Sequence, residues 1–347
     1  MSKTIQAGLA VGWYNFKVMK YVLPSKNQPK IIQSFKRSLD TLSGNIHLLI
    51  LPLLLDLLFL FGKRILVSDI IASWIDAVIL PPSTSPEVLE SWSTLSQQIL
   101  KIIAGFSLTG FLRSFPIGVP SLLAFRPMVS NPSGAFASLQ AQSSLEIFLW
   151  QTFFSLIGFV LGAFYLLQIG IATQGKPFKE IFTNLINKLS NLFTIPVFSI
   201  ISFLIIFIPA LFIIGIISNF VPFFGSVGYF LLTLFFISRI TPIIFSAHDI
   251  ILYENPIVVA IRESIKTVRP TNGKTSIFIL IAFLVSIGTN RLWQIPADNS
   301  WMLLVSIFGH AIVTTLIYIA SFQFYIDARQ CVLESTISST EHAQLMN

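Results

Sequence analysis

Long apolar runs separated by short polar or basic stretches dominate the hydrophobic pattern of the chain. Runs of about 18 or more mostly apolar residues predict membrane-spanning helices, because about 20 helical residues cross the hydrocarbon core of a bilayer. A helix also satisfies its own backbone hydrogen bonds in lipid. The pattern predicts six spans, at 46–65, 147–169, 195–217, 227–247, 276–293 and 302–325.

Shorter stretches carry apolar residues three and four positions apart, which places them on one face of a helix. Two such stretches, 5–23 and 30–42, precede the first predicted span. We therefore expect residues 1–45 to form an amphipathic region on the membrane surface, 46–325 to form the membrane domain, and 326–347 to form a tail. The predicted fold class is an all-α integral membrane protein with interfacial helices.

The longest region without a predicted span is 66–144. It contains an amphipathic piece at 66–80, the breaker PPSTSP and a helical pattern at 87–112. Within that pattern, 99–112 is apolar but short and contains Lys101, so we expect it not to cross the membrane. Four prolines among serines and glycines predict irregular structure at 113–133.

Three amphipathic segments share a spacing and suggest pseudo-repeated units of a surface helix followed by a membrane hairpin. The aligned positions are Phe35, Ser38, Leu39 and Leu42; Phe182, Leu185, Ile186 and Leu189; and Ile261, Ser264, Ile265 and Val268. The first and third copies are the most alike, through SFKRSLDTL and AIRESIKTV. Any amphipathic helix beside a membrane can show this spacing, so duplication and coincidence both remain open.

The composition is typical of a membrane protein, and the positions of the basic residues predict how the chain is oriented in the membrane. Hydrophobic residues make up 54% of the 347 residues and charged residues 11%, which is too apolar for a soluble domain. The net charge of +7 comes from basic residues beside the apolar runs, which favours anionic lipid over nucleic acid as partner. The positive-inside rule predicts cytoplasmic N- and C-termini and an outer position for 66–144. The candidate headgroup contacts on the cytoplasmic side are Lys36, Arg37, Lys179, Arg262, Lys266 and Arg269.

Two segments resemble a known family. The run ENPIVVAIRESIKTVR, followed by a polar turn and a span, and SFKRSL before LLILPLLLD are similar to bacterial multi-pass proteins of unassigned activity. Those proteins are related to the membrane domain attached to some glycerophosphodiester phosphodiesterases. The resemblance implies a bacterial plasma-membrane protein with this architecture. It implies no activity, because the diesterase catalytic domain and its His-Arg motif are absent from the sequence.

Asp56 and Arg239 are the two ionisable residues expected well inside the hydrocarbon. A charge at a helix centre costs about 2.5–3.5 kcal/mol on insertion scales, so each requires a partner or water. Their predicted depths differ by only a few ångström, at about 1.5 Å per helical residue. We expect them to lie close together, either as a structural ion pair or as part of a polar pathway.

Other polar residues give weaker indications of chemistry. His248, Asp249 and Glu254, at the exit of the fourth predicted span, lack metal-ligand spacing and are expected to cap the helix or contact headgroups. His310 is expected to be a hydrogen-bonded packing residue. The run TNGKTS lacks the first glycine of a phosphate-binding loop, and the single cysteine, Cys331, excludes a cysteine-rich metal site. No metal or cofactor site and no catalytic residue is predicted.

These patterns support two functional hypotheses. The first is a non-catalytic accessory or scaffold unit that organises lipid or a membrane complex, with a protein partner on the outer segment 66–144. The alternative is a transporter or channel for a small or lipidic substrate that uses a polar site near Asp56 and Arg239.

Overall fold

The computed structural model describes residues 29–78, 81 and 85–345, and gives the backbone alone for 202, 222, 234, 236–242 and 338–345. The predicted surface helix at 5–23 lies outside the described residues. The fold is all-α apart from a few strands of two or three residues, which confirms the all-α part of the predicted class.

The described part of the chain contains four helices that are long and apolar enough to cross a membrane: Ser144–Thr173, Leu185–Phe220, Asn272–Trp293 and Met302–Ile337. Two bent pairs raise the number to six if each pair is one span. These are Ile31–Gly44 with Ile46–Phe61, bent by 96°, and Ile243–Tyr253 with Ile257–Val268, bent by 113°. Four to six candidate spans are compatible with a multi-pass membrane protein.

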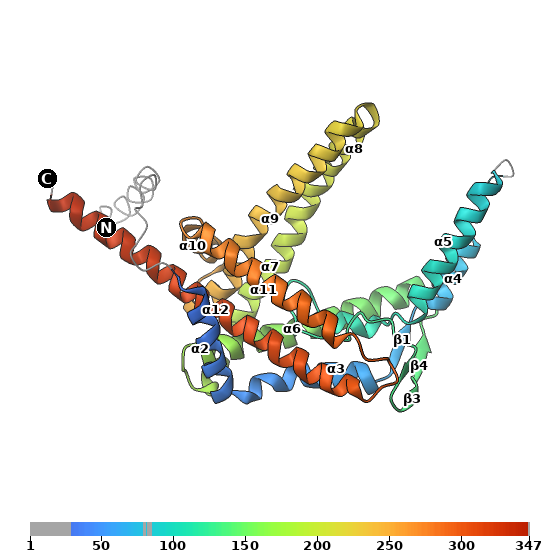
Figure 1. Cartoon of the computed structure of the whole chain (residues 1–347), viewed down its shortest axis with the longest axis horizontal. Helices are drawn as coiled ribbons and strands as arrows, with labels where there is room; N and C mark the ends of the chain where they lie inside the picture. Colours follow the sequence, from blue (N-terminus) through green and yellow to red (C-terminus); the bar gives the residue numbers. More distant parts are fainter. Residues whose placement is uncertain (1–28, 79–80, 82–84, 346–347) are drawn as a thin grey trace, which may run out of the picture.

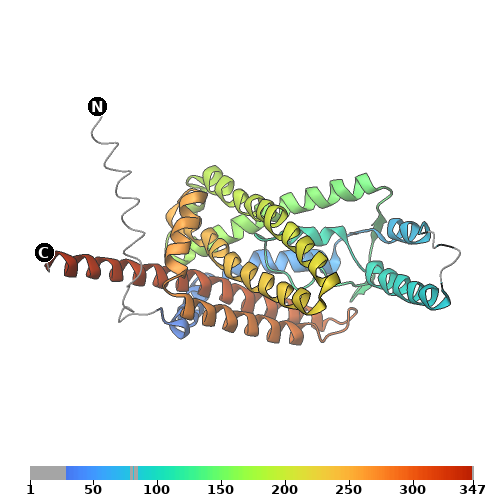
Figure 2. The ribbon, with the colours of Figure 1, turned by 90° about the horizontal axis from the view of Figure 1, so that it is seen from above.

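Four apolar helices lie side by side along the long axis of the molecule (Figures 1 and 2). They are α3 (Ile50–Phe61), α6 (Ser144–Thr173), α11 (Asn272–Trp293) and α12 (Met302–Leu345). A second group diverges from this bundle as a hairpin, formed by α7 (Leu185–Ser202), the π-helix η5 (Phe203–Phe207), α8 (Ile208–Phe220) and α9 (Pro222–Tyr253). The predicted span 195–217 therefore lies within a longer helix that begins at Leu185.

The surface helices α2 (Ile31–Gly44) and α10 (Ile257–Val268) lie at one end of the bundle (Figure 1). The aligned serines Ser38 and Ser264 are fully buried, and Leu42 and Val268 are buried one turn later. The first and third copies of the pattern thus bury matching positions. The second copy differs, because its residues are divided between a 3₁₀ turn, η4 (Phe178–Phe182), and the first turns of α7, with no separate surface helix.

The opposite end carries the short strands and a helical hairpin. There β1 (Arg64–Leu66) pairs in parallel with β4 (Ser138–Gln140), and β2 (Ser130–Asn131) pairs with β3 (Gly134–Ala135). The hairpin consists of α4 (Ser68–Asp76) and α5 (Pro86–Ala104), and η3 (Leu108–Leu112) follows it. The helical pattern at 87–112 is therefore broken between residues 104 and 108, so 99–112 forms no continuous span.

Arg64 holds the strand end of the molecule together. Its guanidinium donates to the carbonyls of Gly105 (3.0 Å) and Met128 (2.5 Å) and lies 3.8 Å from the centre of the Phe136 ring. Burial lowers the pKa of Arg64 to about 10, so the side chain remains charged at neutral pH. One side chain thus connects the end of α5, the irregular segment and the β3–β4 connection.

The irregular segment 113–128 enters the bundle core. Ile117, Val119, Leu123 and Met128 are each at most 3% exposed and belong to the same apolar cluster as α3, α6 and α12. Glycines of α6 permit this close approach: a Cβ at position 158 would lie 2.2 Å from the Leu112 carbonyl oxygen, and one at 162 would lie 2.4 Å from the Gly118 Cα. The prediction of irregular backbone is confirmed, and that backbone is covered by protein.

Candidate functional site

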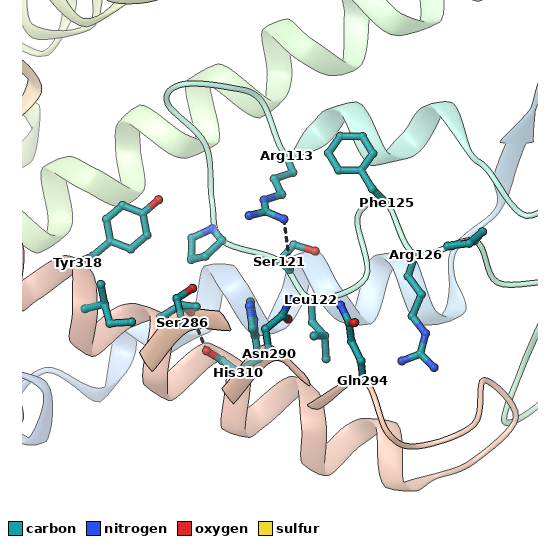
Figure 3. A pocket seen from close by; sticks show the side chains of 14 residues that line it. Arg113, Ser121, Leu122, Phe125, Arg126, Ser286, Asn290, Gln294, His310 and Tyr318 are labelled. Carbon is teal, nitrogen blue, oxygen red and sulfur yellow. Dashed lines mark hydrogen bonds between the residues drawn. The ribbon is translucent and has the colours of Figure 1, made fainter. Parts of the chain in front are cut away.

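A polar cavity of about 580 Å³ lies where the irregular segment meets α11 and α12 (Figure 3). The segment contributes Arg113, Pro120, Ser121, Leu122, Phe125, Arg126 and Pro127. Helix α11 contributes Ser286 and Asn290, and Gln294 follows its last residue. Helix α12 contributes His310, Thr314, Ile317 and Tyr318. Hydroxyl, amide, imidazole and guanidinium groups therefore border one space inside an otherwise apolar bundle.

Asp56 fixes the wall of this cavity. The carboxylate is fully buried and accepts hydrogen bonds from the Ser121 hydroxyl (2.5 Å) and the backbone N–H groups of Leu122 and Leu123 (both 3.0 Å). A carboxylate that accepts from several N–H and O–H donors can remain charged away from water. Asp56 therefore holds the segment 121–123 against α3 and is itself turned away from the open cavity.

The predicted pairing of Asp56 with Arg239 is not tested by the structure. Arg239 lies in α9 among residues 236–242, whose side chains are outside the described part of the molecule. The donors that Asp56 does have are a serine and two backbone N–H groups. Sequence reasoning located the buried charge but had no signal for these partners, because backbone donors carry no residue type.

His310 is a titratable side chain close to Asp56. Its Nδ1 atom lies 3.9 Å from the Asp56 Oδ2 atom, beyond hydrogen-bond distance, and is buried without a hydrogen-bond partner among the described residues. The expectation of a hydrogen-bonded packing histidine therefore does not hold for Nδ1. The ring borders the cavity, but its Nδ1 atom is itself buried, 3.9 Å from the Asp56 carboxylate.

Two arginines border the cavity, and they differ in whether they form an ion pair. Arg126 forms an ion pair with Asp298 (2.8 Å) and donates to the Pro296 carbonyl (2.7 Å). Arg113 is exposed and donates to the Ser121 carbonyl at 3.2 Å. No described carboxylate forms an ion pair with Arg113. Sequence reasoning missed Arg113, because it follows a stretch that was expected to lie outside the membrane.

The cavity extends to the depth of the membrane-spanning helices. His310 lies eight residues and Tyr318 sixteen residues after the start of α12, which corresponds to depths of about 12 and 24 Å at 1.5 Å per residue. Large apolar side chains in the first two turns of α12, such as Val305 and Phe308, are more than half exposed, as expected for a face in contact with lipid. Polar groups at this depth require water or a ligand.

A second buried charge, Asp249, connects helices at the other end of the bundle. Asp249 on α9 is fully buried and accepts hydrogen bonds from the Asn255 side chain (2.6 Å) and the Tyr325 hydroxyl (3.0 Å), and it forms an ion pair with Arg329. This cluster ties the bend between α9 and α10 to α12. The expected capping or headgroup role of Asp249 is therefore replaced by an internal ion pair.

The candidate headgroup residues lie near the same end. Lys36, Lys179, Arg262 and Arg269 are exposed, in keeping with the prediction, which the structure does not test further. Arg37 forms an ion pair with Asp327, and Lys266 pairs with Glu263 at 2.7 Å, so these two charges are partly used within the protein.

Comparisons with family models, with curated proteins and with solved structures give no match for this chain. Among the residues that the structure describes, no group of three or more His, Cys, Asp or Glu side chains could hold a metal ion. The cavity is therefore the feature from which a function can be inferred.

Proposed function

We propose that the chain is a six-span membrane protein that takes a small or lipidic ligand into the polar cavity, in a transport or lipid-handling role. The main support for this proposal is the cavity of about 580 Å³, which Arg113, Asn290 and His310 border at the depth of the spans. Clefts and cavities that bind small molecules have volumes between roughly 300 and 1,000 Å³. The role is non-catalytic in this proposal, since both oxygens of Asp56 already accept structural hydrogen bonds.

We also propose a bacterial plasma-membrane location for the protein and a relationship to a family of multi-pass proteins. Basic residues near α2, η4 and α10 favour a cytoplasmic position for that end, for both termini and for anionic lipid headgroups. The cavity would then face the outer side of a bacterial plasma membrane. The resemblance of SFKRSL and ENPIVVAIRESIKTVR to bacterial multi-pass proteins related to the phosphodiesterase membrane domain supports this assignment.

The six-span topology can be tested by cysteine labelling at Ser85 and Asn272 after replacement of Cys331 by serine. Both positions are exposed, Ser85 before α5 and Asn272 at the start of α11. We expect a membrane-impermeant maleimide to label residue 85 from outside and residue 272 only after the membrane is opened. Labelling of both from the same side would overturn the six-span arrangement.

A substitution that fills the cavity tests whether a ligand binds there. Ser286→Phe places a large ring in the cavity from α11, whereas Ser276→Phe puts the same ring on an exposed position of the same helix. We expect a small molecule or lipid to co-purify with the wild-type protein in native nanodiscs, to be largely lost from Ser286→Phe and to be retained by Ser276→Phe. Mass spectrometry measures the ratio of ligand to protein. Equal ratios in all three proteins would contradict the proposal.

The accessory or scaffold hypothesis is the second candidate, and the α4–α5 hairpin favours it. The hairpin projects from the bundle (Figure 1) and leaves Trp74, Leu95 and Ile102 about half exposed or more. An apolar surface on an outer projection suits a protein partner for segment 66–144. A stoichiometric protein in the same purification, with no ligand lost from Ser286→Phe, would favour this candidate.

A further inference from the structure

We infer that the cavity ligand carries an oxyanion, a phosphate or a carboxylate, and that Arg113 is its ion partner. This inference rests on the proposed ligand-binding function and specifies the chemistry of the ligand. Three observations support it: the charge presented to the cavity, the neutral donors opposite Arg113, and the depth of the site.

The charge that the cavity presents is positive. Arg126 is already neutralised by Asp298, with the two atoms 2.8 Å apart. Asp56 is fully buried and directs both oxygens at donors of residues 121–123. Arg113, by contrast, is exposed and bonded only to a backbone carbonyl among the described residues. Arg113 also interacts electrostatically with the Asp56 carboxylate, but no carboxylate among the described residues forms an ion pair with it, so its guanidinium is available to an anion.

Neutral hydrogen-bonding groups lie across the cavity from Arg113. The side chains of Ser286, Asn290 and Gln294 line it from α11 and its end, while Arg113 comes from the irregular segment (Figure 3). Hydroxyl and amide groups can donate to an anion without adding charge. The planar guanidinium suits bidentate binding of carboxylate or phosphate. An oxyanion between the two walls would thus receive donors from both.

The depth of Arg113 in the bundle explains why a bound anion would stabilise it. Arg113 directly follows Leu112, whose carbonyl meets Gly158, fourteen residues or about 21 Å into α6. A charge at such a depth requires compensation by water or by an opposite charge. A lipid headgroup drawn into the cavity and a soluble anion from the outer side supply the same chemistry, so the experiment must separate these two sources.

The test uses the full-length protein, stripped of lipid in a neutral detergent, and follows thermal unfolding by tryptophan fluorescence. Four probes are titrated: dioctanoyl phosphatidylglycerol, octanoate, inorganic phosphate and uncharged dioctanoylglycerol. The variants are Arg113→Gln, Arg113→Lys, the cavity-filling Ser286→Phe and the control Arg291→Gln. Arg291 is an exposed arginine in the last turn of α11 that does not line the cavity.

We expect at least one anionic probe to raise the unfolding midpoint of the wild-type protein. Arg113→Gln should weaken its apparent affinity by at least about tenfold, the loss of one charge-assisted hydrogen bond. Arg113→Lys should lose less, Arg291→Gln should match wild type, and Ser286→Phe should abolish the response. A response to the lipid or octanoate alone identifies a lipidic source, and a response to phosphate identifies a soluble one.

Other results would overturn the inference. If dioctanoylglycerol binds as well as the anionic probes, equally in wild type and Arg113→Gln, and Ser286→Phe blocks it, the ligand is uncharged and only the proposed function stands. If no probe binds, the oxyanion is rejected. The co-purification of ligand with wild type and Ser286→Phe then decides the proposed function separately.

Discussion

Replacing Asp56 by alanine is expected to destabilise the protein more than any other single substitution in the irregular segment or its contacts. The change leaves the Ser121 hydroxyl and the Leu122 N–H buried without an acceptor, and it leaves the Leu123 N–H with the Ser121 hydroxyl oxygen, 3.2 Å away, as its remaining acceptor. Removing one partner of a buried, charged hydrogen-bond network costs about 3–5 kcal/mol. Thermal unfolding in detergent should therefore begin at a markedly lower temperature, and protease should cut the segment 113–128 sooner.

Two variants control this experiment. Asp56→Asn keeps one acceptor oxygen but points an amide N–H₂ at existing donors, so an intermediate loss is expected. Asp40→Asn changes an exposed aspartate of α2 and should leave the unfolding midpoint unchanged. An unfolding midpoint for Asp56→Ala equal to that of Asp40→Asn would show that the three donors find other partners.

Asp249→Ala is expected to have the second-largest effect, at the opposite end of the bundle. It removes the acceptor of the Tyr325 hydroxyl and the Asn255 amide and leaves the Arg329 guanidinium without its buried ion partner. The expected loss of stability is again about 3 kcal/mol, because three donors lose their acceptor and Arg329 keeps only Glu263, 3.9 Å away, as an ion partner. Loss of this contact should also loosen the bend between α9 and α10.

A double-mutant cycle with Arg329→Gln measures the contact directly. We expect the double variant to be little less stable than Asp249→Ala alone, with a coupling energy of about 1–3 kcal/mol. Additive losses from the two single variants would show that Asp249 and Arg329 stabilise the protein independently. Glu334→Gln, an exposed change further along α12, serves as the control.

The periodic features of the chain were predictable from sequence. Apolar runs located the helices, and the prolines of 113–133 located the irregular segment, because both follow from local backbone and solvation preferences. The burial of that segment was not predictable, since it depends on glycines at 158 and 162 that only become informative once the packing against α6 is known.

The site was predictable only in part. Asp56 was identifiable as a charge within an apolar run, but its backbone donors and the cavity beyond them depend on contacts 65 and more residues apart. The ion pair of Asp249 with Arg329 was missed for the same reason, since 80 residues separate the two, whereas Arg113 was missed because its stretch was expected to lie outside the membrane. Tertiary contact, and not local sequence, decides whether such charges are solvated, paired or presented to a ligand.

The insertion of the segment 113–128 beside α3 has a consequence for biogenesis. The ribosome adds Asp56 65 residues before it adds Ser121. Until then the carboxylate has none of these three donors, and a charge at mid-span carries the insertion penalty of about 2.5–3.5 kcal/mol. The first apolar helix is therefore less stable in lipid by itself than with that segment in place. Its stable placement awaits the downstream segment and α6, which makes early membrane integration of this chain a cooperative event.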